Sequence, residues 1–188
     1  PYFNLVDNEF LGVSLGTDLS PSFGDLDMDG DYDLIIGTYS GDILIYENIG
    51  NSTNFNFIYH STILSDDDFW FSSPEMIDID GDQDIDIICG DLYGGIRVFK
   101  QESSFNFVTA SNLFDELNVG YHSSPHFIDI DLDSDMDLLI GGANRYRFYL
   151  NDGNFNYEET DLVNIPYLGK NMKFTSGYLH EAHQLDLI

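Results

Sequence analysis

Short apolar runs alternate with turn residues along most of this chain. In the first well-defined stretch the runs cover Ser22–Leu26, Tyr32–Thr38, Asp42–Asn48 and Phe55–His60, and they are rich in Ile, Leu, Tyr and Phe. Gly, Asn, Asp and Ser separate them, which is typical of strands joined by tight turns. No stretch has a convincing 3.6-residue apolar period. The pattern therefore predicts an all-β protein of antiparallel strands.

The same group of four strands recurs about every fifty residues. The pair Phe-Asn marks its last strand at Phe3, Phe55, Phe105 and Phe155, at intervals of 52, 50 and 50 residues. A Ser-Pro pair precedes the first strand of three units. Four short strands in a unit of this length are the signature of a β-propeller blade, whereas leucine-rich and hexapeptide solenoids have shorter periods. The predicted fold is a series of four-stranded propeller blades.

Between the first two strands of each unit lies a nine-residue segment with five aspartates. These segments read DLDMDGDYD at 25–33, DIDGDQDID at 78–86 and DIDLDSDMD at 129–137. Carboxylates this crowded repel one another, and a bound divalent cation compensates the repulsion. A metal-free Asp-rich turn is the alternative, but three copies in one register favour metal. The candidate ligands are Asp25, Asp27, Asp29, Asp31, Asp33, Asp78, Asp80, Asp82, Asp84, Asp86, Asp129, Asp131, Asp133, Asp135 and Asp137.

Calcium suits these loops best. Ca²⁺ takes six to eight oxygens, which a tight loop supplies from alternate positions. In the first loop we expect one side-chain oxygen from each of the first three aspartates, the backbone carbonyl of Asp31, whose carboxylate we assign to solvent, and both carboxylate oxygens of Asp33. Mg²⁺ demands stricter octahedral geometry, and Zn²⁺ prefers Cys and His, which the loops lack. The sequence predicts three Ca²⁺ sites.

The residue at the sixth loop position predicts which of the three sites is best formed. A loop of this kind turns sharply there, which favours glycine at positive φ. Gly30 meets that need in the first loop, whereas Gln83 and Ser134 stand in the other two. We therefore expect the first site to be the best formed. The loops differ from an EF-hand, because no Glu stands at the twelfth position and strands rather than helices flank them.

The first unit also resembles a known family. Phe23-Gly24 followed by DLDMDGDYDLIIG resembles the FG-GAP/VCBS repeats of integrin α-subunit-type propellers, and the turns Asn48-Ile49-Gly50 and Asn151-Asp152-Gly153 resemble the turn before that family's last strand. The second and third units lack the Phe-Gly pair. The resemblance implies a propeller whose cations brace the hairpin between the first and second strands of each blade. It implies no single activity, because related propellers serve in adhesion receptors, lectins and polysaccharide-active enzymes.

We interpret residues 1–188 as one repeat domain. Its parts are a preceding last strand with a linker, three blades and the start of a degenerate fourth repeat, at residues 1–20, 21–61, 74–109, 125–160 and 161–188 respectively. Because a closed propeller has four to eight blades, we expect a segment of a larger propeller whose first and last units pack against further blades. Closure by copies of the same chain is the alternative.

Composition narrows the partners and the location. The net charge is −28, with 6 Lys and Arg against 34 Asp and Glu, which argues against nucleic acid and anionic membranes. No apolar run is long enough for membrane insertion. Millimolar calcium outside cells would keep weak sites filled, so an extracellular or cell-surface location is expected. Cys89 is the only cysteine and is interpreted as a buried apolar residue. Asn51 begins the only N-glycosylation sequon.

The sequence favours binding over catalysis. His180-Glu181-Ala182-His183 is one residue short of a metalloprotease motif, and no nucleophile motif accompanies the other histidines. Strand alternation places a possible ligand face opposite the aspartate loops, because aromatic rings beside polar groups suit sugar or protein ligands. Alternatively, Trp70 and Phe71 fill the junction between blades. The residues of this face are Trp70, Tyr93, Tyr121 and Arg145.

Two functions fit these observations. One is a non-catalytic, calcium-stabilised extracellular propeller module for adhesion or structural assembly, with protein or glycan ligands or copies of itself as partners. The alternative is the propeller of a carbohydrate-active protein, either a lectin or a polysaccharide lyase-like enzyme. Exposed aromatics in equivalent loops of each unit would favour a lectin. A carboxylate and histidine cluster in the central channel would favour an enzyme.

Overall fold

The computed structural model describes residues 15–64, 69–110, 114, 117–143 and 145–160, together with the backbone of 176–177 and 186–187. These residues form three four-stranded antiparallel sheets and one short strand pair, and no helix occurs among them. The chain is all-β over this part, as the apolar pattern predicts.

Each sheet is a meander in which strands follow one another in sequence order. The first sheet contains β1 (Ser20–Gly24), β2 (Asp33–Gly37), β3 (Ile43–Asn48) and β4 (Phe57–Ile63). The second contains β5 (Ser73–Ile77), β6 (Asp86–Gly90), β7 (Ile96–Ser103) and β8 (Asn106–Ala110). The third contains β9 (Ser124–Ile128), β10 (Asp137–Gly141), β11 (Tyr146–Asn151) and β12 (Tyr157–Thr160). β13 (Ser176–Gly177) pairs with β14 (Asp186–Leu187).

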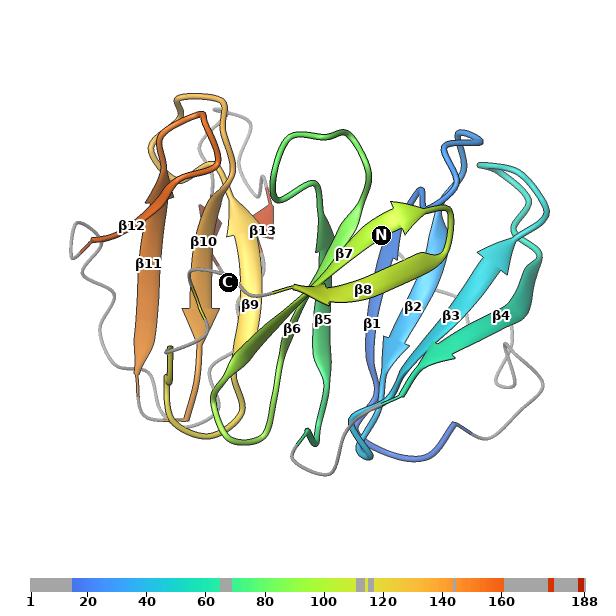
Figure 1. Cartoon of the computed structure of the whole chain (residues 1–188), viewed down its shortest axis with the longest axis horizontal. Helices are drawn as coiled ribbons and strands as arrows, with labels where there is room; N and C mark the ends of the chain where they lie inside the picture. The colour runs from blue at the N-terminus through green and yellow to red at the C-terminus, as the bar shows by residue number, and fades with distance from the viewer. Residues whose placement is uncertain are drawn as a thin grey trace.

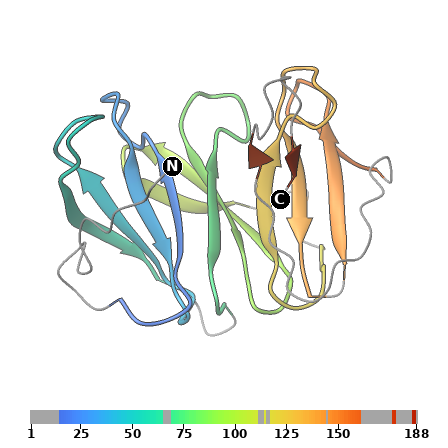
Figure 2. The ribbon, with the colours of Figure 1, turned by 180° about the vertical axis from the view of Figure 1, so that it is seen from behind.

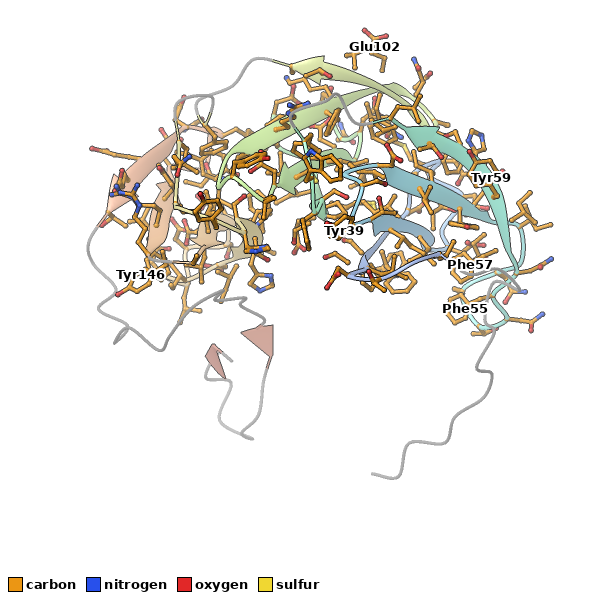
Figure 3. All side chains as sticks on the ribbon, turned by 90° about the horizontal axis from the view of Figure 1, so that it is seen from below. Tyr39, Phe55, Phe57, Tyr59, Glu102 and Tyr146 are labelled. Atoms are coloured by element: carbon orange, nitrogen blue, oxygen red, sulfur yellow. The ribbon has the colours of Figure 1, made fainter. Side chains whose placement is uncertain are left out.

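The three sheets stand side by side in an arc that does not close into a ring (Figure 1, Figure 3). Their first strands, β1, β5 and β9, are neighbours and lie on the inner side of the arc (Figure 2, Figure 3). The β1–β2 and β3–β4 hairpins and their counterparts fall at one end of the sheets, at the top of Figure 1. The β2–β3 turns and the connections between sheets fall at the other end. Below, these are called the hairpin face and the connection face.

The second strand of each sheet is buried on both sides. β2, β6 and β10 are fully buried, and their alternate side chains reach opposite faces of the sheet. Ile35 from β2 and Ile87 from β6 therefore meet in one core between the first and second sheets. Ile88 from β6 and Leu138 from β10 meet in the next core. Two-sided burial explains why these strands are continuous apolar runs rather than alternating ones.

Serine side chains link consecutive sheets at the connection face. The Ser72 hydroxyl accepts a hydrogen bond from the Thr38 amide at 2.7 Å and donates to the Asp42 carbonyl at 3.0 Å. The Ser123 hydroxyl repeats this arrangement, accepting from the Asp91 amide at 2.7 Å and donating to the Gly95 carbonyl at 2.6 Å. Each serine precedes the first strand of its own sheet. Its hydroxyl forms hydrogen bonds with the backbone of the turn between the second and third strands of the preceding sheet. The link thus fixes the spacing of neighbouring sheets.

The strand ends differ from the sequence expectation for local reasons. β1 ends at Gly24, because the Leu26 amide bonds to the Asp33 carboxylate instead of a neighbouring strand. β4 begins at Phe57, because the Asn48 side-chain oxygen accepts from the Gly50 and Asn56 amides and holds the chain in a turn. Most of the expected fourth repeat and of residues 1–20 lies outside the described residues.

Gly90 tests the contact between sheets. A Cβ at this position would lie 2.2 Å from the Ser123 carbonyl oxygen, so Gly90→Ala must push the second and third sheets apart. We expect a loss of about 1–3 kcal/mol in unfolding free energy, the usual cost of overpacking, measured by urea denaturation. Gly24→Ala is the control, because its Cβ would meet the flexible side chain of Met76 at 3.1 Å. Equal losses in both variants would contradict this account.

Candidate metal centre

All three aspartate loops share one backbone conformation. The sixth loop position has positive φ in each, with values of 94° at Gly30, 78° at Gln83 and 82° at Ser134. The fourth position is left-handed as well, at Met28, Gly81 and Leu132 (φ 63°, 80° and 65°). The sharp turn expected at the sixth position is therefore present even where glycine is absent. The left-handed fourth position has no signal in the sequence, because only one loop has glycine there.

The first aspartate of each loop gathers backbone amides around its carboxylate. Asp25 accepts from the amides of Asp29 and Gly30 at 3.1 and 3.0 Å. Asp129 accepts from Asp133 and Ser134 at 3.1 Å each. Asp78 makes the corresponding bond to Gln83, together with one of 2.7 Å from Gly81. These bonds curl the loop so that successive aspartates converge.

The aspartate at the ninth loop position, called the ninth aspartate below, holds the loop against its sheet. Asp33 is buried, and its two carboxylate oxygens accept from the amides of Leu26 and Asn48, both at 2.8 Å. Asp86 and Asp137 make the same pair of bonds in their units. Burial raises the pKa of Asp33 and of Asp86 to about 6, and it also raises the pKa of Asp137. In each unit, therefore, a carboxylate that is costly to ionise sits at the base of the loop.

Three carboxylates converge in every loop, each offering an oxygen within 4.8 Å of the other two. The first group joins the first, third and fifth loop positions, and the other two join the first, third and ninth. The structure thus brings together part of the expected ligand set in each unit. The groups are Asp25, Asp27 and Asp29; Asp78, Asp80 and Asp86; and Asp129, Asp131 and Asp137.

The seventh aspartate does not lie where the sequence analysis placed it. We assigned the Asp31 carboxylate to solvent, but this residue is only 6% exposed, so that assignment is wrong. Its Oδ1 atom is buried without a hydrogen-bond partner, as is Oδ1 of Asp135 in the third loop. Burial and the neighbouring Asp29 raise the pKa of Asp31, and burial raises that of Asp135 to about 6. Buried carboxylate oxygens without partners are what a cation would satisfy.

The second loop has a local counter-charge. Lys100 pairs with Asp80, and the hydrogen bond between them lowers the pKa of this carboxyl. The first and third loops have no ion pair among the described residues. The lysine ammonium competes with a cation for Asp80, so the second loop has the weakest need for metal.

The sequence analysis missed the residues on the third strand that form hydrogen bonds with the ninth aspartate of the loop. Asn48, Gln101 and Asn151 each donate a backbone amide to the ninth aspartate. Their side chains are buried as well. The Gln101 side chain spans two sheets, because its Nε2 donates to the Leu26 carbonyl at 2.9 Å. A signal existed, since an amide residue recurs at these three positions with the repeat period.

The candidate ligand face lies opposite the aspartate loops, at the connection face. Trp70, Tyr93 and Tyr121 are 38%, 50% and 58% exposed, and Arg145 is exposed too. Trp70 does not fill the junction between sheets. The neighbouring Phe69 does so, being 1% exposed with the Arg97 guanidinium 4.4 Å from the centre of its ring. Asn51 is exposed in the β3–β4 turn at the hairpin face. Cys89 is fully buried, as expected.

The sequence matches the FG-GAP-like repeat family at residues 25–89 and 78–140, so each match runs from one aspartate loop into the next. The chain belongs to this family. A comparison with curated proteins gives no match. In this FG-GAP-like protein the matched unit runs from one loop through the last three strands of its sheet and the first strand of the next sheet to that sheet's second strand. The matched repeat therefore spans the contact between sheets.

Two substitutions separate the structural role of the ninth aspartate from metal binding. Asp33→Ala leaves two backbone amides without acceptors, at about 1–3 kcal/mol each, so it should destabilise the protein even in EDTA. Asp27→Asn keeps an oxygen for the Asp29 amide (3.2 Å) and removes one of the repelling charges, so the stability in EDTA should stay the same or rise. Chemical denaturation in EDTA measures both. A loss in Asp27→Asn as large as that in Asp33→Ala would contradict these assignments.

The buried carboxylates also predict an unusual pH dependence. The folded-state pKa values of Asp33 and Asp86 are about 6, above the ordinary 3.8, so the folded state binds protons more tightly between these values. Stability in EDTA should therefore rise as the pH falls from 7 to 5. In excess calcium the trend should reverse, because protons compete with the cation. Melting temperatures in the two buffers test this, and parallel trends would contradict it.

Proposed function

We propose that this chain is part of a calcium-stabilised extracellular β-propeller and serves as a non-catalytic module for adhesion or structural assembly. The observation that carries the proposal is the triplicate loop geometry. Three loops with the same backbone turns each converge three carboxylates, and two of them hold a buried carboxylate oxygen without a partner. FG-GAP-like repeats often bind calcium, and the oxygen-only ligand set suits that ion.

Within each loop the residues have distinct tasks. The aspartates at loop positions one, three and five would hold Ca²⁺. In the second and third loops the aspartate at position nine would hold it as well. The ion would supply the positive charge that offsets their repulsion. The ninth aspartate also ties the loop to the third strand through its two backbone hydrogen bonds. A bound ion would therefore brace the hairpin between the first and second strands and, through it, the sheet.

An aromatic surface on the first sheet supports a larger propeller. Phe23 and Phe55 are 54% and 55% exposed, and both rings contact Phe57. The residues corresponding to Phe23 in the next units are covered by the preceding sheet: Met76 packs in the core between the first and second sheets and Phe127 in the next core. The surface of Phe23 and Phe55 thus has the composition of a contact between blades.

A glutamate and a histidine side by side on the inner strands favour a second candidate function. Glu75 on β5 lies 3.3 Å from His126 on β9, measured between Oε1 and Nδ1. A carboxylate and an imidazole at this distance are suited to acid–base chemistry, so the alternative of a carbohydrate-active propeller is retained. Release of reducing or unsaturated ends from a polysaccharide panel, abolished in Glu75→Gln, would support this alternative over the non-catalytic one.

We also propose an extracellular location and glycosylation of Asn51. An extracellular environment is proposed because millimolar calcium would fill even weak sites there. Among the described residues no helix is long and apolar enough to cross a membrane. The exposed Asn51 would accept a glycan in that environment.

Calcium titration tests the proposal directly. Calorimetry of the metal-free chain should give three bound Ca²⁺, and saturation at about 100 times the dissociation constant should add about 2.7 kcal/mol per site to the stability. Asp27→Asn, Asp80→Asn and Asp131→Asn should each remove one site. Asp152→Asn, in an exposed turn at the same face, is the control and should remove none. Unchanged melting temperature and no heat of binding would contradict the proposal.

The exposed aromatic surface gives a further prediction. Phe23→Ser combined with Phe55→Ser should reduce self-association of the 188-residue chain, because it removes apolar area worth about 25 cal/mol per Å² when buried. Light scattering of both proteins in calcium measures this. The same replacement of Tyr93, exposed at the connection face, is the control. A wild-type chain that is a stable, cooperatively melting monomer would contradict the need for further blades.

A further inference from the structure

A cavity of about 320 Å³ lies at the connection face, where the inner strands begin. All three sheets contribute to its lining. Asp18 and Ser20 come from the first unit, Phe71 and Ser73 from the second, and His122 from the third. Ligand pockets usually measure about 300–1,000 Å³, so this one suits a ligand about the size of a single sugar ring. It is separate from the aspartate loops, which lie at the opposite face.

Three lining residues occupy the same place in the three units, and all three are left-handed. Asp18, Phe71 and His122 each stand two residues before the Ser-Pro pair, with φ values of 55°, 55° and 59°. Asp and His tolerate this conformation, but for a bulky aromatic residue it is an outlier. Glycine would relieve the strain, yet each unit has a functional side chain there instead. Backbone strain of this kind clusters at ligand-binding and active sites, and here it borders the cavity.

The side chains of the cavity combine an aromatic ring with polar groups. The Phe71 ring lies between Tyr39 and His122, with ring centres 4.4 and 5.1 Å away. The Ser73 hydroxyl lies 3.4 Å from that of Ser20 and 3.3 Å from that of Ser124, so hydroxyls from all three inner strands stand next to one another. Ser72 and Ser123 instead use their hydroxyls to bond the backbone of the preceding sheet.

We propose that this cavity binds a neutral sugar residue. A sugar ring offers an apolar face for Phe71 and hydroxyls for Ser20, Ser73, Asp18 and His122, a combination typical of carbohydrate contacts. The carboxylate of Asp18 and the net charge of −28 disfavour an acidic sugar. The inference goes beyond calcium binding, because none of these residues belongs to an aspartate loop.

Trp70 provides the readout, since it is the only tryptophan and its ring lies 5.9 Å from that of Tyr39. The whole chain in calcium is titrated with the methyl glycosides of glucose, galactose and mannose, and with methyl glucuronide. At least one neutral glycoside should give a saturable fluorescence change and a heat of binding. Methyl glucuronide should bind at least about tenfold more weakly, a difference that Asp18→Asn should reduce.

Substitution of the left-handed residues separates binding from folding. His122→Gly and Phe71→Gly remove a lining side chain and relieve backbone strain, so each should weaken sugar binding about tenfold or more. His122→Gly should keep or raise the melting temperature, and both variants should keep the calcium stoichiometry. Tyr59→Ala is the matched control, because Tyr59 is an exposed aromatic residue on β4 and does not line the cavity.

Three results would overturn the inference: no binding of any neutral glycoside, binding retained in both His122→Gly and Phe71→Gly, or equal loss in Tyr59→Ala. The test is independent of the proposed function. A chain that binds three Ca²⁺ and no sugar contradicts only the cavity assignment. A chain that binds the sugar without calcium contradicts only the metal proposal.

Discussion

Repulsion between carboxylates at the hairpin face is the constraint on which the arrangement depends. Two like charges 4 Å apart repel by about 1 kcal/mol in water and about 4 kcal/mol at the effective dielectric near a protein surface. Each loop brings oxygens of three carboxylates within 4.8 Å of one another. The protein offsets part of the repulsion with backbone amides directed at the first and ninth aspartates. Amides alone leave the buried oxygens of Asp31 and Asp135 without partners, and the proposed cation would complete the compensation.

The same loops connect this local chemistry to the sheets. The ninth aspartate opens the second strand, which is buried on both sides, and it bonds to the end of the third strand. Its position therefore couples the shape of the loop to the register of the hairpin. Gln101 extends the coupling to the preceding sheet by donating to Leu26. The proposed metal binding at the hairpin face would thus stabilise the same elements as the packing between sheets.

The connection face carries the features that differ between units. The inner strands start from equivalent left-handed residues, but the side chains there are a carboxylate, a phenyl ring and an imidazole. In a repeat protein, positions that keep their backbone and vary their side chain are the ones free to form a ligand site, because the repeated packing does not depend on them. The hairpin face therefore has the same aspartate loop in every unit, whereas the connection face has different side chains in each unit.

Periodicity made the strand order predictable from the sequence, since apolar runs such as residues 34–36 recur with the repeat and can only be buried strands. The aspartate loops were predictable for the same reason. The burial of Asp31 was not, because it depends on how the loop folds back over the end of the third strand. The left-handed fourth loop position was not predictable, because only one loop has glycine there. The serine links and the cavity arise from contacts between units, which local patterns do not encode.

The most direct test of the central claim is an anomalous difference map from crystals grown in calcium. The account predicts three peaks, one in each aspartate loop. Side-chain oxygens of the aspartates at loop positions one and three should lie about 2.3–2.6 Å from each peak. Oδ1 of Asp31 should no longer lack a partner once the first peak is included. Loops with their aspartates turned into solvent and no anomalous density between them would contradict the account.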